Sequence, residues 1–472
     1  MKTLATSLLV LATATLAGPT ALVAQNAPTN LLPGAQDEDD APQEIGDGDA
    51  DDAVTSSRVA PATETGPVEM TSEPVVQKFD PVVQQWNVAQ AQALVAAIEG
   101  IGTHGLIPAD YDLPGLRAAI AAGPGAMLDE EASRRFVWLV EDMRDGRTPM
   151  DNRTQWFVMD PDADRYRSGA VLKQALETGD IVAAIEGVAP LHPDYEALRS
   201  ELAEAKPGSK RHKLVQANMD RWRWLPRDLG HQYLITNVPE YQLRLTVNDK
   251  IMRTYRTIVG KPGRTATPQL AESVEGVILN PNWTVPQSIV KGENLGARVL
   301  ANPSWASSKG YKATKGANGY ISVVQGPGPG NALGRMKLDM PNRHAIFFHD
   351  TPSRGLFSQS DRALSHGCIR TERATELAFT LAILQAGLTG EEAADILASG
   401  EYTRVEFNST MPAYITYFTM GTNIDGEMAT FKDIYDRDAP VLTAFEAPRK
   451  ANRSRVTDEE IIEIVNDPRD IA

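Results

Sequence analysis

The spacing of hydrophobic residues predicts a helical domain over residues 76–228. Apolar residues recur three or four positions apart in VAQAQALVAAIEG and EEASRRFVWLVEDMRDG, and each segment ends at a glycine, a residue common at helix C-termini. Proline-containing stretches such as IPADYDLPG separate these segments. We expect the region to be a scaffold, and we interpret His104 and His192, which fall in its turns, as structural residues.

The pattern changes to alternation after residue 228 and predicts a β-rich domain over residues 229–440. The segment HQYLITNVPEYQLRLTVNDKIMRTYRTIVG is rich in β-branched and aromatic residues, with Asn248-Asp249 as a hairpin turn. A helix is expected at ATELAFTLAILQAG, and a second hairpin is expected around Asp425-Gly426. The predicted fold class is therefore multidomain α+β, a helical scaffold domain followed by a β-rich, β-sandwich-like domain.

The N-terminal residues have the pattern of an export signal. The segment MKTLATSLLVLATATLAGPTALVAQ has one lysine, then an apolar run and then small residues, which predicts a secretory signal peptide over residues 1–24. No cysteine follows the apolar run, so a lipoprotein anchor is not expected. The mature chain is therefore predicted to be exported.

Acidic residues are concentrated near the N-terminus. The chain has 46 Lys and Arg against 62 Asp and Glu, a net charge of −16. Acids are dense between Asp37 and Asp52, where no Lys or Arg occurs. We expect residues 25–75 to be a disordered acidic linker and residues 441–472 to be a flexible tail. No basic face is expected, which argues against nucleic-acid binding.

The chain contains a single cysteine, Cys368, in the segment HDTPSRGLFSQSDRALSHGCIRTE (349–372). Exported proteins usually pair their cysteines in disulfides, and a lone cysteine has no partner within its own chain. An inert buried thiol and an intermolecular bridge are the alternatives to a reactive thiol. We favour the reactive thiol, because an idle thiol is prone to oxidation in an oxidising compartment.

Two histidines near the cysteine are candidate bases. A thiol reacts as its thiolate, and a neighbouring imidazole can accept its proton. His366 lies two residues before Cys368, where the local backbone can direct its ring away from the sulfur. His349 lies at the end of the apolar strand AIFF, which is a rigid support for a base. We therefore predict that His349 is the base.

Other polar groups complete a candidate acyl-transfer site. Backbone N–H groups around Gly367 could stabilise a tetrahedral oxyanion, and the absence of a side chain there lets a substrate approach. Arg370 suits recognition of a carboxylate. Asn331 and Arg335, in the glycine-rich loop GPGPGNALGR, are candidate substrate contacts.

Neither a metal nor a nucleotide cofactor is expected. A zinc site is the competing interpretation of this region, but the paired ligand spacing of zinc motifs is absent; its ligands would be His344, His349, His366 and Cys368. The glycine-rich loop does not fit a dinucleotide fingerprint, because Leu333 occupies the position of the third glycine.

The motif around the cysteine resembles that of the L,D-transpeptidases of bacterial cell-wall assembly, which carry a YkuD-type catalytic domain. Their signature is a His, a spacer, then Ser/Thr-His-Gly-Cys, a hydrophobic residue and Asn or Arg. It matches His349 followed by Ser365-His366-Gly367-Cys368-Ile369-Arg370. Segments such as GLIPADYDL, NMDRWRWLP, IVGKPGRTATP and HDTPSRGLF are similar to the large, YcbB-like Gram-negative branch with a helical scaffold domain. The similarity covers roughly residues 76–440.

The resemblance implies a two-step acyl transfer in the periplasm. Cys368 would attack a peptidoglycan stem tetrapeptide between its third and fourth residues, and the thioester would pass to the amine of a second stem's diamino acid, forming a 3→3 cross-link. His349 would move the protons, and the N–H groups of Gly367 and Cys368 would form the oxyanion site. Inactivation by carbapenems is a further implication. The candidate substrate-binding residues are Ser365, His366, Arg370, Asn331, Arg335 and Trp283.

The chain departs from that branch in ways that leave alternatives open. The peptidoglycan-binding module often found within the scaffold is not expected, because only a short segment joins LHPDYEALR and NMDRWRWLP. In addition, Phe347-Phe348 replace a frequent tyrosine before the histidine. Water or a lysine of an envelope protein could replace the stem amine as acceptor, giving carboxypeptidase or protein-attachment activity. Other cell-wall enzymes are candidate partners. A non-catalytic wall-binding protein is the alternative of a different class.

Overall fold

In the computed structural model, the described residues are 82–450 together with 461, 462, 464, 467 and 469. The predicted signal peptide (1–24) and acidic linker (25–75) lie outside the described residues. The predicted α+β architecture is confirmed, because the helical region precedes a β-rich region built on a large sheet.

The N-terminal region is helical. Its α-helices are α1 (Val88–Gly100), α2 (Leu113–Ala122), α3 (Ala126–Asp145), α4 (Asp162–Arg165), α5 (Ser168–Thr178), α6 (Ile181–Glu186), α7 (Pro193–Glu204) and α8 (Lys210–Trp222), with short 3₁₀ turns η1 (Ile101–His104), η2 (Pro108–Tyr111) and η3 (Met150–Asn152). Local signals start several of them, since Asn87 caps α1 in a capping box and Ser209 caps α8. His104 is buried and its Nδ1 lies 3.0 Å from the Tyr195 hydroxyl, as expected for a structural histidine.

The β-rich region is built on a nine-stranded sheet. Its strands are β1 (Gln232–Asn237), β2 (Gln242–Val247), β3 (Lys250–Gly260), β4 (Leu270–Leu279), β8 (Met336–Asp339), β9 (Phe348–His349), β10 (Ala363–Ser365), β11 (Ile369–Thr371) and β12 (Thr403–Thr416). The strand order is β10-β3-β11-β9-β8-β4-β12-β1-β2, and β2 also pairs with β3, so the pairing closes into a circuit. The sheet is thus more nearly a closed barrel than the two facing layers of a sandwich.

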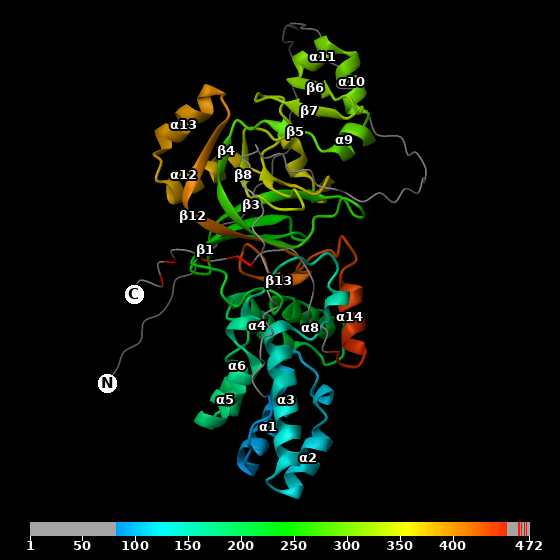
Figure 1. The fold of residues 1–472 in the computed structure, drawn as a ribbon, viewed down its shortest axis with the longest axis vertical. Helices are drawn as coiled ribbons and strands as arrows, with labels where there is room; N and C mark the ends of the chain where they lie inside the picture. Colours follow the sequence, from blue (N-terminus) through cyan, green and yellow to red (C-terminus); the bar gives the residue numbers. More distant parts are fainter. Residues whose placement is uncertain (1–81, 451–460, 463, 465–466, 468, 470–472) are drawn as a thin grey trace, which may run out of the picture. The chain divides into compact units, whose positions relative to one another are not determined.

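Both predicted hairpins are present. Asn248 and Asp249 have φ values of 48° and 55° between β2 and β3, which is the backbone of a tight two-residue turn. Gly426, with φ of 82°, lies in the turn between β13 (Met420–Thr422) and β14 (Met428–Thr430). The predicted helix after the cysteine is α12 (Ala374–Ala386), which packs across β4, β8 and β12 and is followed by α13 (Gly390–Ser399) (Figure 1).

A small subdomain is inserted between β4 and β8. It contains the three-stranded sheet β5-β7-β6, and its elements are β5 (Trp283–Thr284), α9 (Gln287–Gly292), α10 (Leu295–Ala301), α11 (Pro303–Ser308), β6 (Tyr311–Lys315) and β7 (Ile321–Gln325). It has its own apolar cluster around Val285, Val290 and Val323. This insert, which we call the cap subdomain (residues 283–325), therefore folds around its own core.

The prediction of a flexible tail from residue 441 is wrong for the first part of that segment. Helix α14 (Asp438–Glu446) buries Val441 and Ala444, and Val441 belongs to the same apolar cluster as the N-terminal helices. The Arg147 guanidinium donates to the backbone carbonyl of Ala444, and Arg221 forms an ion pair with Asp438 at 2.7 Å. The apolar face and these buried arginines order the helix against α8.

Candidate active site

The adjacent strands β8, β9 and β11 have one face in the apolar core and an opposite face with charged and reactive side chains. Met336, Leu338, Phe348 and Ile369 are fully buried and belong to the apolar cluster that α12 covers. Because side chains alternate along a strand, the residues between them point to the opposite face. That face carries Lys337, Phe347, His349, Cys368 and Arg370. We call it the site face.

The register of these strands places the site-face residues in rows. Lys337 pairs with His349 between β8 and β9, and His349 pairs with Arg370 between β9 and β11. Residues in register lie side by side on one face of a sheet, so Lys337, His349 and Arg370 form one row. Cys368 and Phe347 immediately precede β11 and β9 and occupy the next row, with the Ile369 N–H donating to the Phe347 carbonyl at 3.0 Å. The structure thus brings the predicted nucleophile and base into neighbouring rows.

His349 is held with one ring nitrogen available for proton transfer. Its Nδ1 donates to the backbone carbonyl of Asp350 at 2.5 Å, in the tautomer that this acceptor requires. Its Nε2 has no hydrogen bond to any residue in the described part of the chain. The Asp350 carboxylate is fixed in turn, since it accepts from the Arg335 N–H at 2.8 Å. The ring is therefore oriented as a proton acceptor through Nε2.

Burial and nearby cations keep the His349 ring neutral. Burial, followed by the positive charge of Arg370, lowers the pKa of His349 to about 3. The carbonyl of Asp350 acts in the opposite direction but is outweighed. At neutral pH the imidazole is accordingly unprotonated, which is the state a base needs.

The Cys368 thiol is also neutral at rest. It is half-buried, and its Sγ donates to the carbonyl of Ala345 at 3.4 Å. Burial raises the pKa of Cys368, against the effects of the Lys337 and Arg370 charges, which favour the thiolate. The resting pair is therefore a thiol and a neutral imidazole, and proton transfer accompanies the reaction instead of preceding it.

Gly367 and Ser365 are joined by hydrogen bonds in the bend before Cys368. The Gly367 N–H donates to the Ser365 hydroxyl at 3.2 Å, and that hydroxyl donates to the Cys368 carbonyl at 2.6 Å. The Gly367 N–H is thus engaged within the bend, and the buried Ser365 hydroxyl stabilises the bend. Gly367 has φ of 118°, a conformation that disfavours any side chain, and an added Cβ would lie 3.1 Å from Ile346.

His366 contacts the cap subdomain. Its side chain is exposed, and Nε2 lies 3.3 Å from the carboxylate of Glu293, which follows α9 in the cap subdomain. The contact links the loop that carries the cysteine to the cap subdomain. It does not place His366 where a base for Cys368 is needed.

The other predicted substrate contacts are not assembled with the site face. Buried Asn331 donates to the carbonyls of Pro281 and Gly326 at 3.0 and 2.9 Å, so it fixes its own loop. Arg335 donates to Asn280 and to the carbonyl of Leu397 at 3.1 and 2.5 Å. Trp283 packs against the core of the cap subdomain. Internal hydrogen bonds and packing engage these side chains, and their contact with a substrate stays a prediction.

Lys337 was not among the residues predicted from the sequence. The segment MKLD alternates two buried apolar residues with two charged ones, which is a visible signal of a two-faced strand. The register with His349 is long-range information that this signal does not contain.

The described residues contain neither a metal centre nor a membrane span. No group of three or more His, Cys, Asp or Glu side chains in this part of the chain could hold a metal ion. In particular, the ring of His344 lies 4.3 Å from that of Phe157, and His366 pairs with Glu293. Among the same residues, no helix is long and apolar enough to cross a bilayer.

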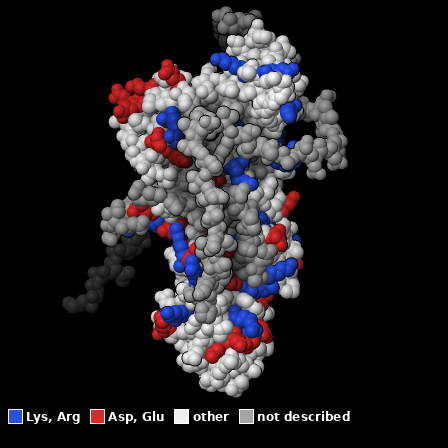
Figure 2. Space-filling model, in the orientation of Figure 1, with Lys and Arg blue, Asp and Glu red and all other residues white. Residues whose placement is uncertain are grey.

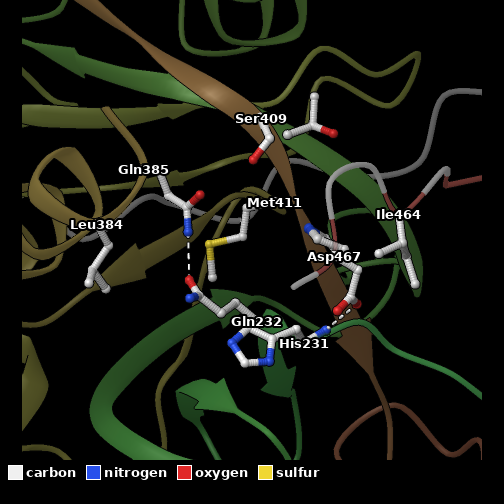
Figure 3. Close-up of a pocket in the computed structure, with 10 residues that line it drawn as sticks. His231, Gln232, Leu384, Gln385, Ser409, Met411, Ile464 and Asp467 are labelled. Atoms are coloured by element: carbon white, nitrogen blue, oxygen red, sulfur yellow. Dashed lines mark hydrogen bonds between the residues drawn. The ribbon is translucent and has the colours of Figure 1, made fainter. Parts of the chain in front are cut away.

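A separate cavity of about 120 Å³ lies at the start of β1 (Figure 3). Gln385 of α12 donates to Gln232 at 2.6 Å in it, and the His231 N–H donates to Asp467 at 3.0 Å. None of the predicted site residues lines this cavity. It is therefore distinct from the site face.

Surface charge differs between two parts of the β-rich region. Figure 2 shows acidic side chains gathered over α13 and basic side chains over α10, α11 and β6. The exposed basic residues of the cap subdomain are Lys291, Arg298, Lys309, Lys312 and Lys315. The cap subdomain, whose Glu293 contacts the cysteine loop, is therefore positively charged.

Comparisons with known proteins identify two domains. Residues 231–393 match the model of the L,D-transpeptidase catalytic domain (YkuD), and residues 83–202 match the model of a scaffold domain. A provisionally named L,D-transpeptidase of Haemophilus influenzae is 29% identical over 289 residues, which are 57% of this chain and 58% of the relative. The chain thus spans less than two thirds of the length of this curated relative.

Solved structures with similarity to the chain are also L,D-transpeptidases. An L,D-transpeptidase from Mycobacterium smegmatis shares 15% identity with a TM-score of 0.20, over 40% of this chain and 59% of that one. L,D-transpeptidase 1 of Mycobacterium tuberculosis shares 12% identity with a TM-score of 0.18, over 40% of this chain and 62% of that one.

Proposed function

We propose that this chain, which combines an L,D-transpeptidase catalytic domain with a scaffold domain, is an exported cysteine acyltransferase that forms 3→3 cross-links in periplasmic peptidoglycan. The observation that carries the proposal is the site face, where Cys368 and His349 occupy neighbouring rows of one sheet. The neutral imidazole with a free Nε2 supports His349 as base. The basic cap subdomain supports a substrate with several carboxylates, because positive potential concentrates anionic ligands.

The first half-reaction would form a thioester. His349 Nε2 accepts the thiol proton as Cys368 Sγ attacks the carbonyl between the third and fourth residues of a stem tetrapeptide. The tetrahedral oxyanion collapses, the C–N bond breaks, and the proton passes from His349 to the departing amine of D-alanine. The Cys368 N–H is the backbone donor proposed for the oxyanion, since the Gly367 N–H is engaged by Ser365.

The second half-reaction would return the thiol. The side-chain amine of a second stem's diamino acid attacks the thioester carbonyl, and His349 removes its proton. Breakage of the C–S bond yields the 3→3 amide, and the proton on His349 returns to the Cys368 sulfur. Arg370, on the same face, is proposed to hold a stem carboxylate.

The acceptor distinguishes this function from its variants. Water as acceptor would give an L,D-carboxypeptidase, and a lysine of an envelope protein would give covalent attachment of that protein. Mass spectrometry of an intact sacculus digest separates the three products. 3→3 dimers are expected, whereas shortened tripeptides or lysine-linked protein as the sole product would replace the proposal.

Cys368→Ala tests the nucleophile. We expect it to abolish dimer formation from purified disaccharide-tetrapeptides while circular dichroism shows an intact fold, because no other side chain of this chain offers a thiol. Undiminished dimer formation would refute the assignment. Unreactive wild-type protein that binds sacculi would instead support the non-catalytic wall-binding alternative.

His349→Ala and His366→Ala form a matched pair for the base. We expect His349→Ala to suppress acylation of Cys368 by about 10²–10⁴-fold, the range typical of general base catalysis. His366→Ala should have a much smaller effect, because its ring faces Glu293. The reverse ranking would overturn the choice of base.

A further inference from the structure

Lys337 occupies a position on the site face that the proposed chemistry has not yet used. It is the direct cross-strand neighbour of His349, which in turn neighbours Arg370. The row therefore has a cation at each side of the base. Its ammonium lies 4.0 Å from the centre of the Phe347 ring, and Phe347 is in the row that contains Cys368. Lys337 is thus directed toward the row of the nucleophile.

The surroundings of Lys337 leave its charge available to an anion. Neither the Lys337 ammonium nor the Arg370 guanidinium forms a hydrogen bond or an ion pair with any residue that the structure describes. The nearest acid on the same face of β8 is Asp339, and its carboxylate is bound by Arg404 of β12. The remaining ionisable group in the row is His349, which is neutral. Two partly buried cations therefore share a face with one thiol and no free carboxylate.

We propose that Lys337 is an activating residue whose ammonium, acting with the Arg370 guanidinium, stabilises the Cys368 thiolate. The proposal rests on Cys368 being the nucleophile of the proposed function. A positive charge in a poorly solvated site favours the charged form of an acidic neighbour. Burial raises the pKa of Cys368 and lowers the pKa of Lys337. Against these effects, Lys337 acts to lower the pKa of Cys368, and Asp339 and Cys368 act to raise the pKa of Lys337.

The same two cations act oppositely on the base. Both disfavour a positive charge on His349. The proton that His349 accepts from Cys368 is therefore held weakly and is readily passed on to the leaving amine. Lys337 would favour the thiolate product of proton transfer and, at the same time, keep the imidazolium short-lived. No net proton is gained or lost in this role, and Lys337 stays protonated throughout.

The pH dependence of Cys368 alkylation by iodoacetamide tests the proposal without any peptide substrate. Only the thiolate reacts, so the midpoint of the rate profile reports the pKa of the thiol. We expect Lys337→Met to move the midpoint upward by about one pH unit, which lowers the rate below the midpoint about tenfold. Lys337→Arg, which keeps the charge, should retain most of the wild-type profile.

Lys250→Met is the matched control, because Lys250 is exposed in the β2–β3 hairpin and should leave the profile unchanged. Lys337→Gln is a second variant that keeps the proposal testable if the methionine variant folds poorly. An unchanged midpoint in a folded Lys337→Met or Lys337→Gln protein would overturn the proposal. An unchanged midpoint with a raised KM for the tetrapeptide would also overturn it, and would assign Lys337 to binding of a substrate carboxylate. If Lys337→Met shifts the midpoint but the wild-type protein forms no cross-links, the role of Lys337 stands and only the proposed function is refuted.

Discussion

Buried cations have opposite surroundings in the two regions of this protein. In the helical region, Arg223 is fully buried and bonded to Asp220, to the Tyr195 hydroxyl at 2.7 Å and to the carbonyl of His104. On the sheet, Lys337 and Arg370 are partly buried and have no such partners within the described residues. Arg223 is therefore paired within the helical region, whereas the two cations of the site face are available to a bound anion.

The contrast separates charges that stabilise structure from charges that serve chemistry. Burying an ion is costly, and removal of one partner of a buried pair leaves the other uncompensated. Removal of an unpaired cation leaves no buried partner uncompensated, so it should not destabilise the fold. It should instead reduce the stabilisation of the anion that the cation faces. Stability and reactivity should therefore respond to different substitutions in the two regions.

Asp220→Ala should cause the largest loss of stability. The fully buried Asp220 carboxylate accepts from the N–H groups of Arg147 and Thr148 at 2.8 and 3.0 Å, and from Trp224 Nε1 at 3.2 Å. Its removal leaves these donors without this acceptor and Arg223 without its carboxylate partner. We expect a loss of about 3–5 kcal/mol in the free energy of unfolding, measured by urea denaturation. The exposed Glu391→Ala is the control, and a loss below about 1 kcal/mol for Asp220→Ala would undo the contrast.

Acid should destabilise both regions through one histidine each. Burial lowers the pKa of His104 and of His349 to about 3, below the unfolded value of 6.5. Between these pH values the unfolded chain binds more protons, so stability is complete above pH 6.5 and falls as the pH drops toward 3. Each histidine should contribute up to about 1.4 kcal/mol per pH unit in this window.

Glutamine variants sharpen this second comparison. His104→Gln and His349→Gln should each flatten the dependence of the unfolding free energy on pH between 4 and 6. Only His349→Gln should also reduce Cys368 acylation, because His104 is occupied by Tyr195 in the helical region. Equal effects of both variants on acylation would show that the two histidines are not functionally distinct.

Arg370→Met should have the smallest effect on stability. Its guanidinium has no ion-pair partner among the described residues, so the variant should change the free energy of unfolding by less than about 0.5 kcal/mol or increase it. Cys368 alkylation at pH 8 should nevertheless slow down. A destabilisation above about 2 kcal/mol would show that Arg370 is a structural cation like Arg223.

Local signals in the sequence were sufficient for much of the fold. The helices, the Asn248-Asp249 and Asp425-Gly426 turns and the apolar strand before His349 depend on residues within a few positions of one another. The proximity of His349 to the cysteine region was also predictable, because His349 ends an apolar strand and a single loop connects that strand to the cysteine motif. Helix α14 was missed since its stabilising partners, such as Arg147, are about 300 residues away.

The details of the site depended on long-range pairing. Lys337 becomes a neighbour of His349 only through the β8–β9 register. Asn331 and Arg335 resembled substrate contacts because their acceptors at Pro281 and Leu397 are 50 and 62 positions distant. The hydrogen bond from the Gly367 N–H to Ser365 likewise depends on a backbone conformation that residue types alone do not specify.

The measurement that most directly tests the central claim is peptide mapping by mass spectrometry after brief incubation with a stem tetrapeptide and acid quenching. The wild-type protein should carry the tripeptide acyl group as a thioester on Cys368, with release of D-alanine. The adduct should be absent in Cys368→Ala and strongly reduced in His349→Ala, while His366→Ala should retain it. An acyl group on any other residue, or release of D-alanine by Cys368→Ala at the wild-type rate, would contradict the account.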